Sequence, residues 1–372
     1  MTDVRNHQYD VLVIGAGGAG LRAAIEATRD GASVAVICKS MLGKAHTVMA
    51  EGGAAAALAN KDPRDSWQTH FRDTMKGGKY LNDWRMAEIH AKESPDRIRE
   101  LEQWGAIFDR IPPGLKGADG KPLKAGTISQ RNFGGHTYPR LAHIGDATGL
   151  ELIRTLQDRG VHSGMDVFME YTVRRLFTTD GRVSGCFAYN RADGTLHTFQ
   201  GKTTILATGG ITRCWAICSG SWEYTGEGHA LAYWAGAEMG DMEFVQFHPT
   251  ALHHRRMPRP LLSEALRGHG AVIRDHDGQR FVDELSPRDV VSRAMTRRML
   301  DSDVDHLWLD ATGLTAFPAR FPTIASALAE LGLEPGSDWL PIAPAAHDLC
   351  GGVVTDLVGA TTVDGLWAAG EV

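Results

Sequence analysis

The sequence has little cysteine, no excess of basic residues and no long apolar run. Its 372 residues include five cysteines, an odd number at irregular spacing, which argues against a disulfide framework and indicates reduced thiols. The formal net charge of -6 gives no electrostatic reason to bind nucleic acid. No apolar run is long enough to span a bilayer, and the polar first residues do not resemble a signal peptide. These absences predict a cytoplasmic protein without direct membrane insertion.

Metal-ligand spacing is also absent. Cys214 and Cys218 are four positions apart, but no second cysteine or histidine pair stands at a matching distance. The loop His253–Arg256 near Arg259 matches no motif, so it reads as solvated. No metal site is predicted.

Glycine, in contrast, is concentrated at one informative place near the N-terminus. The apolar run Tyr9–Ile14 leads into a G-x-G-x-x-G turn made of Gly15, Gly17 and Gly20, with Gly18 inside it. The first glycine permits a tight turn, the second lets a pyrophosphate approach the backbone, and the third lets the following helix pack on the strand. The turn therefore predicts a dinucleotide site, with the phosphates at a helix N-terminus.

The next elements complete a βαβ unit. Leu21–Asp30 is expected to be a helix, and Ser33–Ile37 a second buried strand. A dinucleotide site usually ends this strand with an acidic residue that binds a ribose hydroxyl. Cys38 and Lys39 stand there instead, followed by Ser40, so the sequence gives poor support for a nicotinamide cofactor.

Helices and hairpins are expected after this unit. Asn82–Trp104 predicts two short helices, the second capped by Ser94 with Pro95 at its first position. The turn pairs Asp180–Gly181 and Asp193–Gly194 predict β-hairpins. Both hairpins are expected to extend the nucleotide-binding sheet.

The residue composition of the later part of the chain changes and then returns to that of the N-terminal part. Thr203–Gly210 is a buried strand ending in glycines, residues 241–344 carry polar loops and arginine-rich helices, and Gly365–Gly370 returns to the strand style of the N-terminus. The expected fold is α/β. A Rossmann-like domain with added hairpins, residues 1–240 and 345–372, is interrupted by a smaller α+β domain.

Eight motifs resemble the flavoprotein family of succinate dehydrogenase and fumarate reductase flavoprotein subunits and L-aspartate oxidase. They are GAGGAG at Gly15–Gly20, AHTVMAEGG at Ala45–Gly53, ATGG at Ala207–Gly210, TGEGHA at Thr225–Ala230, EFVQFHPT at Glu243–Thr250, SEALRG at Ser263–Gly268, SPRDVVSRA at Ser286–Ala294 and AAGEV at Ala368–Val372. The resemblance runs the whole length of the chain. It implies an FAD-binding domain, a capping domain at 241–344 and an active site between them.

The resemblance also implies which residues hold FAD and which partners the chain has. The positions expected to contact the cofactor are Gly15, Gly17, Gly18, Gly20, Lys39, Ser40, His46, Thr47, Gly52, Gly53, Ala207, Thr208, Gly209 and Glu371. A lone histidine is more often structural, but the motif around His46 favours covalent attachment of FAD, as in the dehydrogenase and reductase members. In those members, membrane-anchor subunits together with an iron–sulfur subunit would hold the chain peripherally on the inner face of the membrane.

The second half carries the residues that the resemblance assigns to a small dicarboxylate substrate. His248, Ser263, Arg288 and His347 match positions that bind substrate carboxylates or transfer protons. Arg288 is the expected proton donor. Glu264 and Arg267, which lie on one helical face, restore its proton. The alternatives are an ordinary surface ion pair for Glu264 and Arg267, and a helix-start contact for Arg288.

Phe133 favours succinate or fumarate over L-aspartate. L-aspartate oxidases have a carboxylate at this position that pairs with the substrate ammonium, whereas a phenyl ring leaves that charge unpaired at a high energetic cost. The sequence motifs around Ser263 and His347 are nevertheless more similar to those of L-aspartate oxidase, which stays the alternative. Asp348 also replaces the tyrosine that commonly follows this histidine.

A third hypothesis is a truncated, catalytically impaired family member. Relatives continue beyond the GEV motif with a second substrate-binding arginine, a helix whose N-terminus meets the flavin, and a helical C-terminal domain. With these segments absent, the chain as written is expected to bind FAD and turn over weakly.

Overall fold

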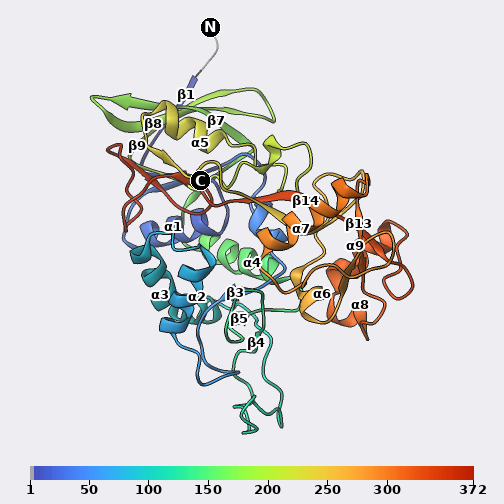
Figure 1. Ribbon diagram of the computed structural model, residues 1–372. Helices are drawn as coiled ribbons and strands as arrows, with labels where there is room; N and C mark the ends of the chain where they lie inside the picture. The colour runs from blue at the N-terminus through green and yellow to red at the C-terminus, as the bar shows by residue number, and fades with distance from the viewer. Residues whose placement is uncertain (1–3) are drawn as a thin grey trace. The chain divides into compact units, whose positions relative to one another are not determined.

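The computed structural model describes residues 4–372 and separates into two compact units (Figure 1). The first unit contains the described residues up to Met49 together with Leu152–Gln246 and Ala346–Val372. The second contains Ala50–Glu151 and Phe247–Ala345. The domain boundaries expected from the motifs stay a prediction.

A seven-stranded sheet organises the first unit. Its strands are β1 (Val4–Ile14), β2 (Val34–Cys38), β6 (Asp166–Met169), β7 (Tyr171–Thr179), β8 (Arg182–Asn190), β9 (Leu196–Leu206) and β16 (Leu366–Ala368). The order is β6-β2-β1-β9-β8-β7, with β16 paired to β9. The strands β6, β2, β1, β9 and β16 pair in parallel. All five residues of β2 are buried, as expected for a strand covered on both faces.

The predicted hairpins are confirmed as an antiparallel extension of this sheet. The turn at Asp180–Gly181 joins β7 to β8, and the turn that includes Asp193–Gly194 joins β8 to β9. The sheet core includes Leu12, Phe199 and Leu206, which have no exposed surface. The expected α/β fold with a Rossmann-like sheet is confirmed.

Short elements complete the first unit. They are α1 (Gly18–Arg29), η1 (His46–Met49), the end of α4 (Thr148–Val161), η2 (Thr212–Cys214), α5 (Glu227–Trp234) and the two-stranded pair β10 (Met239–Gly240) and β15 (Gly352–Val353). Helix α1 packs on β1 and β2, and α5 lies beside β7 (Figure 1). Both helices begin at residues of the expected dinucleotide motifs.

The second unit combines two small sheets with helices. The sheet β3 (Ala54–Ala55), β5 (Leu141–Ala142) and β4 (Gln130–Arg131) is antiparallel, and the other has the order β11 (Val245–Leu252), β14 (Leu340–Leu349), β13 (Leu307–Asp310) and β12 (Val272–Arg274). The helices are α2 (Trp67–Gly77), α3 (Trp84–Gln103), α6 (Glu264–Gly268), α7 (Arg288–Asp301), α8 (Phe317–Arg320) and α9 (Pro322–Glu330). Buried Leu252, Met295 and Leu309 belong to one core that α6, α7 and the larger sheet share.

The prediction of two short helices between Asn82 and Trp104 is wrong. Helix α3 is continuous, with Asp83 as its N-cap and Pro95 inside it. Pro95 has no N–H for the carbonyl of Ala91, but the buried Ser94 hydroxyl donates to that oxygen at 3.5 Å and partly replaces the missing bond. Neither α3 nor any other helix within residues 4–372 has both the length and the apolarity to cross a membrane.

Candidate active site

A pocket in the first unit surrounds the glycine-rich turn. The space between its lining residues, including the part that is open to solvent, is about 950 Å³. The predicted cofactor residues that line it are Gly15, Gly17, Gly18, Lys39, Ser40, His46, Thr47, Ala207, Thr208, Gly209 and Glu371. Of the remaining three, Gly20 packs beneath the turn, while Gly52 and Gly53 belong to the second unit.

The three motif glycines serve different purposes. A Cβ on Gly15 would lie 2.0 Å from the carbonyl oxygen of Ala207, and one on Gly20 would lie 2.0 Å from that of Gly15. A Cβ on Gly17 would meet no protein atom closer than 3.5 Å. Packing of the chain therefore requires Gly15 and Gly20, whereas Gly17 leaves room for something else, which fits a bound pyrophosphate.

The start of α1 also suits an anion. Its N-cap residue Gly17 offers no side-chain cap, and the first turn holds no acidic residue. The Gly18 N–H donates to the Thr47 hydroxyl at 3.1 Å. Because the first backbone N–H groups of a helix have no partner within the helix, this end of α1 fits the phosphates of FAD.

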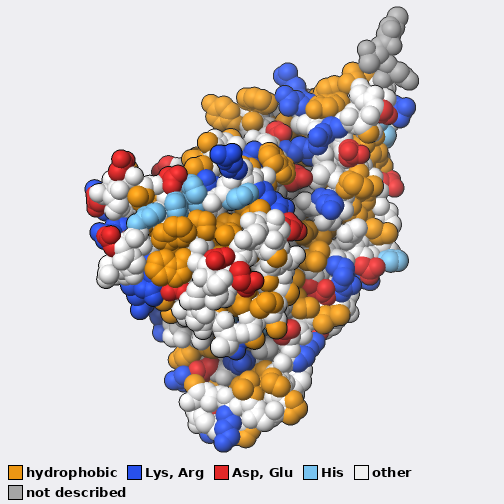
Figure 2. All heavy atoms as spheres, turned by 90° about the vertical axis from the view of Figure 1, so that its right-hand side faces the viewer, with side chains coloured by type: hydrophobic (Ala, Val, Ile, Leu, Met, Phe, Trp, Pro, Cys, Tyr) orange, Lys and Arg blue, Asp and Glu red, His pale blue; other side chains and the backbone are white. Residues whose placement is uncertain are grey.

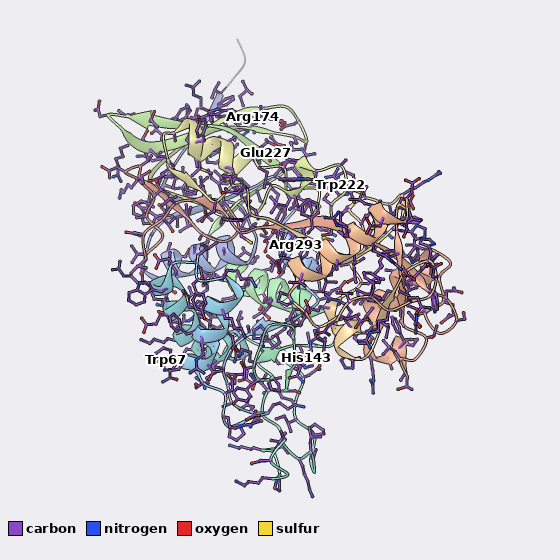
Figure 3. All side chains as sticks on the ribbon, in the orientation of Figure 1. Trp67, His143, Arg174, Trp222, Glu227 and Arg293 are labelled. Atoms are coloured by element: carbon purple, nitrogen blue, oxygen red, sulfur yellow. The ribbon has the colours of Figure 1, made fainter. Side chains whose placement is uncertain are left out.

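Glu227 is a pocket residue that the sequence reasoning missed. It opens α5 and is labelled in Figure 3. The Lys39 ammonium donates to the Glu227 carboxylate at 2.8 Å, and also to the Glu223 carbonyl oxygen at 3.0 Å. An acidic side chain from α5 thus lies beside the end of β2, which has no acidic residue of its own there. Glu227 belongs to the TGEGHA motif, but Glu227 and Lys39 are far apart in the sequence, so their pairing could not be predicted from it.

His46 lines the same pocket as a neutral imidazole. Its Nδ1 accepts a hydrogen bond from the Ser221 N–H at 3.1 Å, and its ring lies 4.2 Å from the Tyr224 ring, centroid to centroid. Burial lowers the pKa of His46 to about 4. Since Nδ1 accepts this hydrogen bond and the ring is neutral, Nε2 carries the ring hydrogen.

His347 is also placed by the first unit. Its Nδ1 lies 2.9 Å from the Ser219 hydroxyl, and its ring lies 6.4 Å from that of His46. The hydroxyl gives the imidazole a fixed orientation. His347 stands near the end of β14, directly before Asp348.

In the second unit, a buried carboxylate joins two arginines. Glu264 Oε2 accepts from Arg288 Nε at 2.9 Å and lies 3.6 Å from Arg267 Nη2. Its other oxygen accepts from the Gly134 N–H at 2.8 Å. The Arg267 side chain is fully buried and that of Glu264 is 4% exposed, whereas that of Arg288 is 25% exposed. The alternative of an ordinary surface ion pair is therefore wrong for Glu264 and Arg267.

Arg267 is a strained partner in this cluster. Burial lowers its pKa, although the Glu264 carboxylate opposes that shift. Among the described residues, Nε of Arg267 has no hydrogen-bond acceptor, while Nη1 donates to the Glu284 carbonyl oxygen. A buried guanidinium with incomplete hydrogen bonding is costly, so this arrangement does not maximise stability.

Three further predicted substrate residues belong to the second unit. The Arg288 guanidinium lies 5.6 Å from the centre of the Phe133 ring. His248 is 2% exposed, and its Nδ1 accepts from the Thr250 N–H at 3.2 Å, so Nε2 carries the proton and can donate. The Ser263 hydroxyl caps α6 by accepting from the Ala265 N–H at 3.3 Å.

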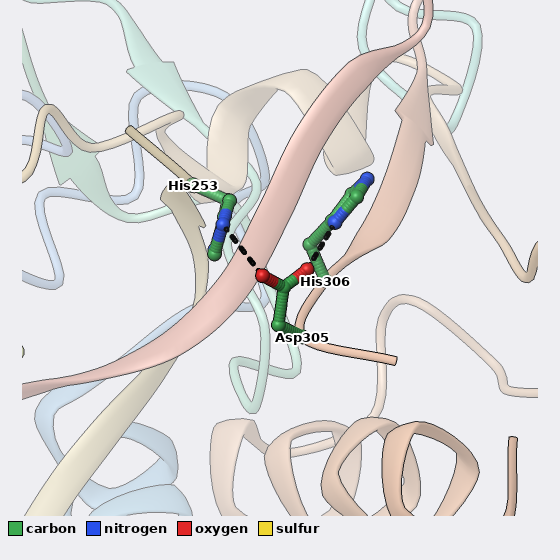
Figure 4. Close-up of side chains that lie close together, drawn as sticks. All are labelled: His253, Asp305 and His306. Carbon is green, nitrogen blue, oxygen red and sulfur yellow. Dashed lines mark hydrogen bonds and ion pairs between the residues drawn. The ribbon is translucent and has the colours of Figure 1, made fainter. Parts of the chain in front are cut away.

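The loop His253–Arg256 is mostly solvated, as expected, because His254, Arg255 and Arg256 are exposed, whereas His253 is half-buried. Histidine side chains form a row on the face drawn in Figure 2, and Figure 4 shows that Asp305 lies between His253 and His306. Asp305 is 2.7 Å from His306 Nδ1 and 3.5 Å from His253 Nε2. The buried Arg259 donates to His253 Nδ1 at 3.2 Å. The contact with Asp305 and the hydrogen bond from the buried Arg259 hold the His253 ring in place.

These side chains form a candidate cation group in the described part of the chain, but their protons oppose it. Arginine can only donate, so His253 Nδ1 is an acceptor and Nε2 carries its hydrogen toward Asp305. His306 likewise points a protonated Nδ1 at the carboxylate. Because a metal would have to displace both protons beside the Arg259 charge, we assign no metal to this group.

Comparison with known proteins decides the family. The model of the FAD binding domain family matches residues 10–372. The chain belongs to this family. Among curated relatives, it is 37% identical to a fumarate reductase (CoM/CoB) subunit of Methanothermobacter marburgensis and 40% identical to L-aspartate oxidase of Streptomyces coelicolor. Each match covers 98% of the chain, but 67% and 63% of the relative.

Solved structures agree with this assignment. Sdh1 of Mycobacterium smegmatis in complex with UQ1 is 44% identical, with a TM-score of 0.83 over 99% of this chain and 64% of that one. A variant of the E. coli quinol fumarate reductase FrdA is 31% identical, with a TM-score of 0.89 over 99% and 65%. The chain spans about two thirds of the length of these relatives. The resemblance read from the motifs is confirmed, and FAD is the cofactor of the family.

Proposed function

We propose that this flavoprotein interconverts succinate and fumarate. Bound FAD supplies a hydride acceptor or donor at flavin N5, and the protein supplies the matching proton. The Arg267–Glu264–Arg288 cluster carries this proposal, because it joins two buried charges to a partly exposed guanidinium. A stability role would favour apolar packing there instead.

The cluster suits proton transfer from the guanidinium of Arg288, a group that stays protonated in proteins. Arg288 keeps a positive charge that pairs with a substrate carboxylate and offers a proton from the guanidinium. Glu264 Oε2 accepts the Arg288 Nε–H at 2.9 Å and is positioned to return a proton to it, while Arg267 holds the other end of the carboxylate. His248, with its proton on Nε2, adds a donor for a second carboxylate.

Phe133 supports succinate or fumarate as the substrate. Its ring faces the Arg288 guanidinium and offers no carboxylate for an ammonium group. L-aspartate oxidase is the second candidate, because the relative with that name is 40% identical over almost the whole chain.

We further propose that His46 attaches FAD covalently. The ring is neutral and lines the pocket, and its Nδ1 already accepts a hydrogen bond, so attachment would occur through Nε2 with release of the hydrogen that this nitrogen carries. The proposal extends to membrane-anchor subunits and an iron–sulfur partner, because the relatives include flavoprotein subunits of succinate dehydrogenase. Such partners would place the chain peripherally at the inner face of the membrane.

Turnover with an artificial electron acceptor tests the substrate. The protein purified with its native partners, where it has them, should oxidise succinate and leave L-aspartate unchanged. Oxidation of L-aspartate without succinate oxidation would establish the second candidate instead. Acid precipitation tests the linkage, because flavin colour should stay with the protein pellet and move to the supernatant in the H46A variant.

A further inference from the structure

A four-residue turn of the second unit, which begins at Phe133, contacts the Glu264 carboxylate. The His136 N–H closes the turn by donating to the Phe133 carbonyl oxygen at 3.3 Å. Gly135 has a φ of 80°, which the third residue of a type II turn requires and which favours glycine. The Gly134 N–H donates to Glu264 Oε1 at 2.8 Å. The position of the turn therefore fixes one of the contacts that hold the carboxylate.

The turn approaches this carboxylate very closely. A Cβ on Gly134 would lie 2.1 Å from Glu264 Oε1, whereas the φ of Gly134 lies outside the left-handed region. The closeness of the carboxylate, and not the backbone conformation, thus requires glycine at this position. A small displacement of the turn would stretch or break the hydrogen bond to Glu264.

An aspartate of α2 holds the residue that follows the turn. Asp73 Oδ2 accepts from the Thr137 N–H at 2.8 Å, and Oδ1 accepts from the Thr137 hydroxyl at 2.7 Å. Arg140 Nη1 donates to Asp73 Oδ2 at 2.8 Å. Hydrogen bonds to a carboxylate are shorter and stronger than those between neutral groups, so Asp73 is a firm anchor for this end of the turn.

Arg140 gives the anchor a buried base. Its side chain has no exposed surface, and Nη2 donates to the fully buried Asp65 at 2.7 Å. Burial would raise the pKa of Asp73, but the hydrogen bonds from Thr137 and Arg140 lower that pKa below its ordinary value, so the carboxylate stays ionised. Because breaking a buried ion pair is strongly destabilising, Arg140 and its two partners should keep their places while the exposed turn follows them.

We propose that Asp73 and Thr137 are positioning residues, which fix the turn that holds Glu264. They act through the Gly134 N–H, which keeps the carboxylate in place between its two arginines. The inference rests on the proposed function in taking Glu264 as the relay carboxylate. It adds residues outside the relay on which the rate of proton transfer depends.

Amide hydrogen exchange of the full chain tests the anchor without any turnover. In T137A, which removes an exposed hydroxyl, exchange in the peptide of residues 132–138 should accelerate by about tenfold, and T137S should restore the parent rate. The matched control is T74A, because the Thr74 hydroxyl donates to the His70 carbonyl oxygen within α2. T74A should leave exchange in this peptide unchanged. Parent-like exchange of the peptide in T137A would overturn the proposal.

Turnover of succinate with an artificial acceptor tests the consequence for the relay. T137A should lower kcat by about tenfold, because a displacement well below 1 Å is enough for such a loss, and should leave KM within about twofold. D73N should lower kcat further, since it weakens the hold on Thr137 while Arg140 keeps Asp65 as a partner. A raised KM with parent-like kcat would refute the positioning role. Absence of succinate turnover in the parent would instead refute the proposed function, and the exchange measurement would still decide whether the anchor holds the turn.

Discussion

The cofactor pocket of the first unit and the Glu264 cluster of the second unit hold their buried ionisable groups in different ways. In the cofactor pocket of the first unit, burial pushes His46 to a pKa of about 4 and Glu371 to about 8, so both favour the neutral form. In the second unit, Glu264 stays between two arginines and accepts a backbone N–H as well. In the cofactor pocket, burial favours the neutral form of both side chains. In the second unit, the Glu264 carboxylate lies between positively charged arginines.

This difference matches what each site has to handle. A pocket for a polyanionic cofactor binds better when its own acids are neutral, because like charges at short range repel. The proposed proton relay needs groups that can gain and lose a proton during turnover, so its carboxylate must lie in contact with both guanidinium donors. The comparison predicts that loss of a single charge in the Glu264 cluster lowers turnover. In the cofactor pocket, changes in side-chain shape and in pH should alter stability and FAD binding.

The largest expected effect comes from removing the exposed end of the relay. R288A should lower kcat for succinate oxidation by about 10³ to 10⁴-fold, at the upper end for loss of a general acid–base group. R288K should also be impaired, because an ammonium lacks the planar fork that pairs with a carboxylate. Steady-state turnover with an artificial acceptor measures both variants.

Arg293 provides the control on the same helix. It is labelled in Figure 3, pairs with Asp289 on the surface of α7 and has a 75% exposed side chain. Exposed pairs contribute about 0–1 kcal/mol, so R293A should keep its turnover within a factor of about two. Equal losses in R288A and R293A would show that α7 is merely being disturbed, and would remove Arg288 from the relay.

A methyl group at two motif glycines separates packing from binding in the first unit. G20A places a Cβ 2.0 Å from a backbone oxygen and should lower the free energy of unfolding by about 3 kcal/mol. G17A meets no close protein atom, so its cofactor-free stability should stay within about 0.5 kcal/mol of the parent while its Kd for FAD rises. Chemical denaturation and FAD titration report the two effects. Equal destabilisation by both variants would contradict the assignment of Gly17 to the ligand.

The parallel strands and the glycine turn could be predicted from the sequence because their causes are local. Gly15, Gly17 and Gly20 lie within six residues, and the buried run of β2 follows directly after α1. The error in α3 also has a local explanation. The Ser94–Pro95 pair is typical of a helix start, but the Ser94 hydroxyl bonds the carbonyl that the proline leaves unpaired, and the helix continues.

The long-range pairings could not be predicted in this way. Lys39 meets Glu227, and Gly134 meets Glu264, only because the fold brings distant segments together. Motif resemblance pointed to Glu264, Arg267 and Arg288 but not to the burial of Glu264 and Arg267, on which the proposed relay depends. The sequence was enough to select the candidate site residues. Their burial and their charged partners became visible only in the folded structure.

The smallest expected effect concerns the acid stability of the first unit. Because burial lowers the pKa of His46 to about 4 from an ordinary 6.5, the unfolded chain binds a proton there between those values while the folded chain does not. The stability that this neutral histidine contributes is therefore complete above pH 6.5 and is lost as the pH falls toward 4. Between pH 7.5 and 5.0 the cofactor-free protein should lose about 2 kcal/mol through this residue.

H46Q isolates that contribution, because glutamine is similar in size and does not titrate. The free energy of unfolding is measured for both proteins by urea denaturation at the two pH values, and the wild-type protein should lose about 2 kcal/mol more than the variant. The other histidines with lowered pKa values, including His70 and His136 of the second unit, remain in both proteins and cancel in the difference. Equal losses of stability in the wild-type protein and H46Q would mean that protonated His46 finds a partner in the cofactor-free pocket. The neutral form of His46 would then depend on bound FAD.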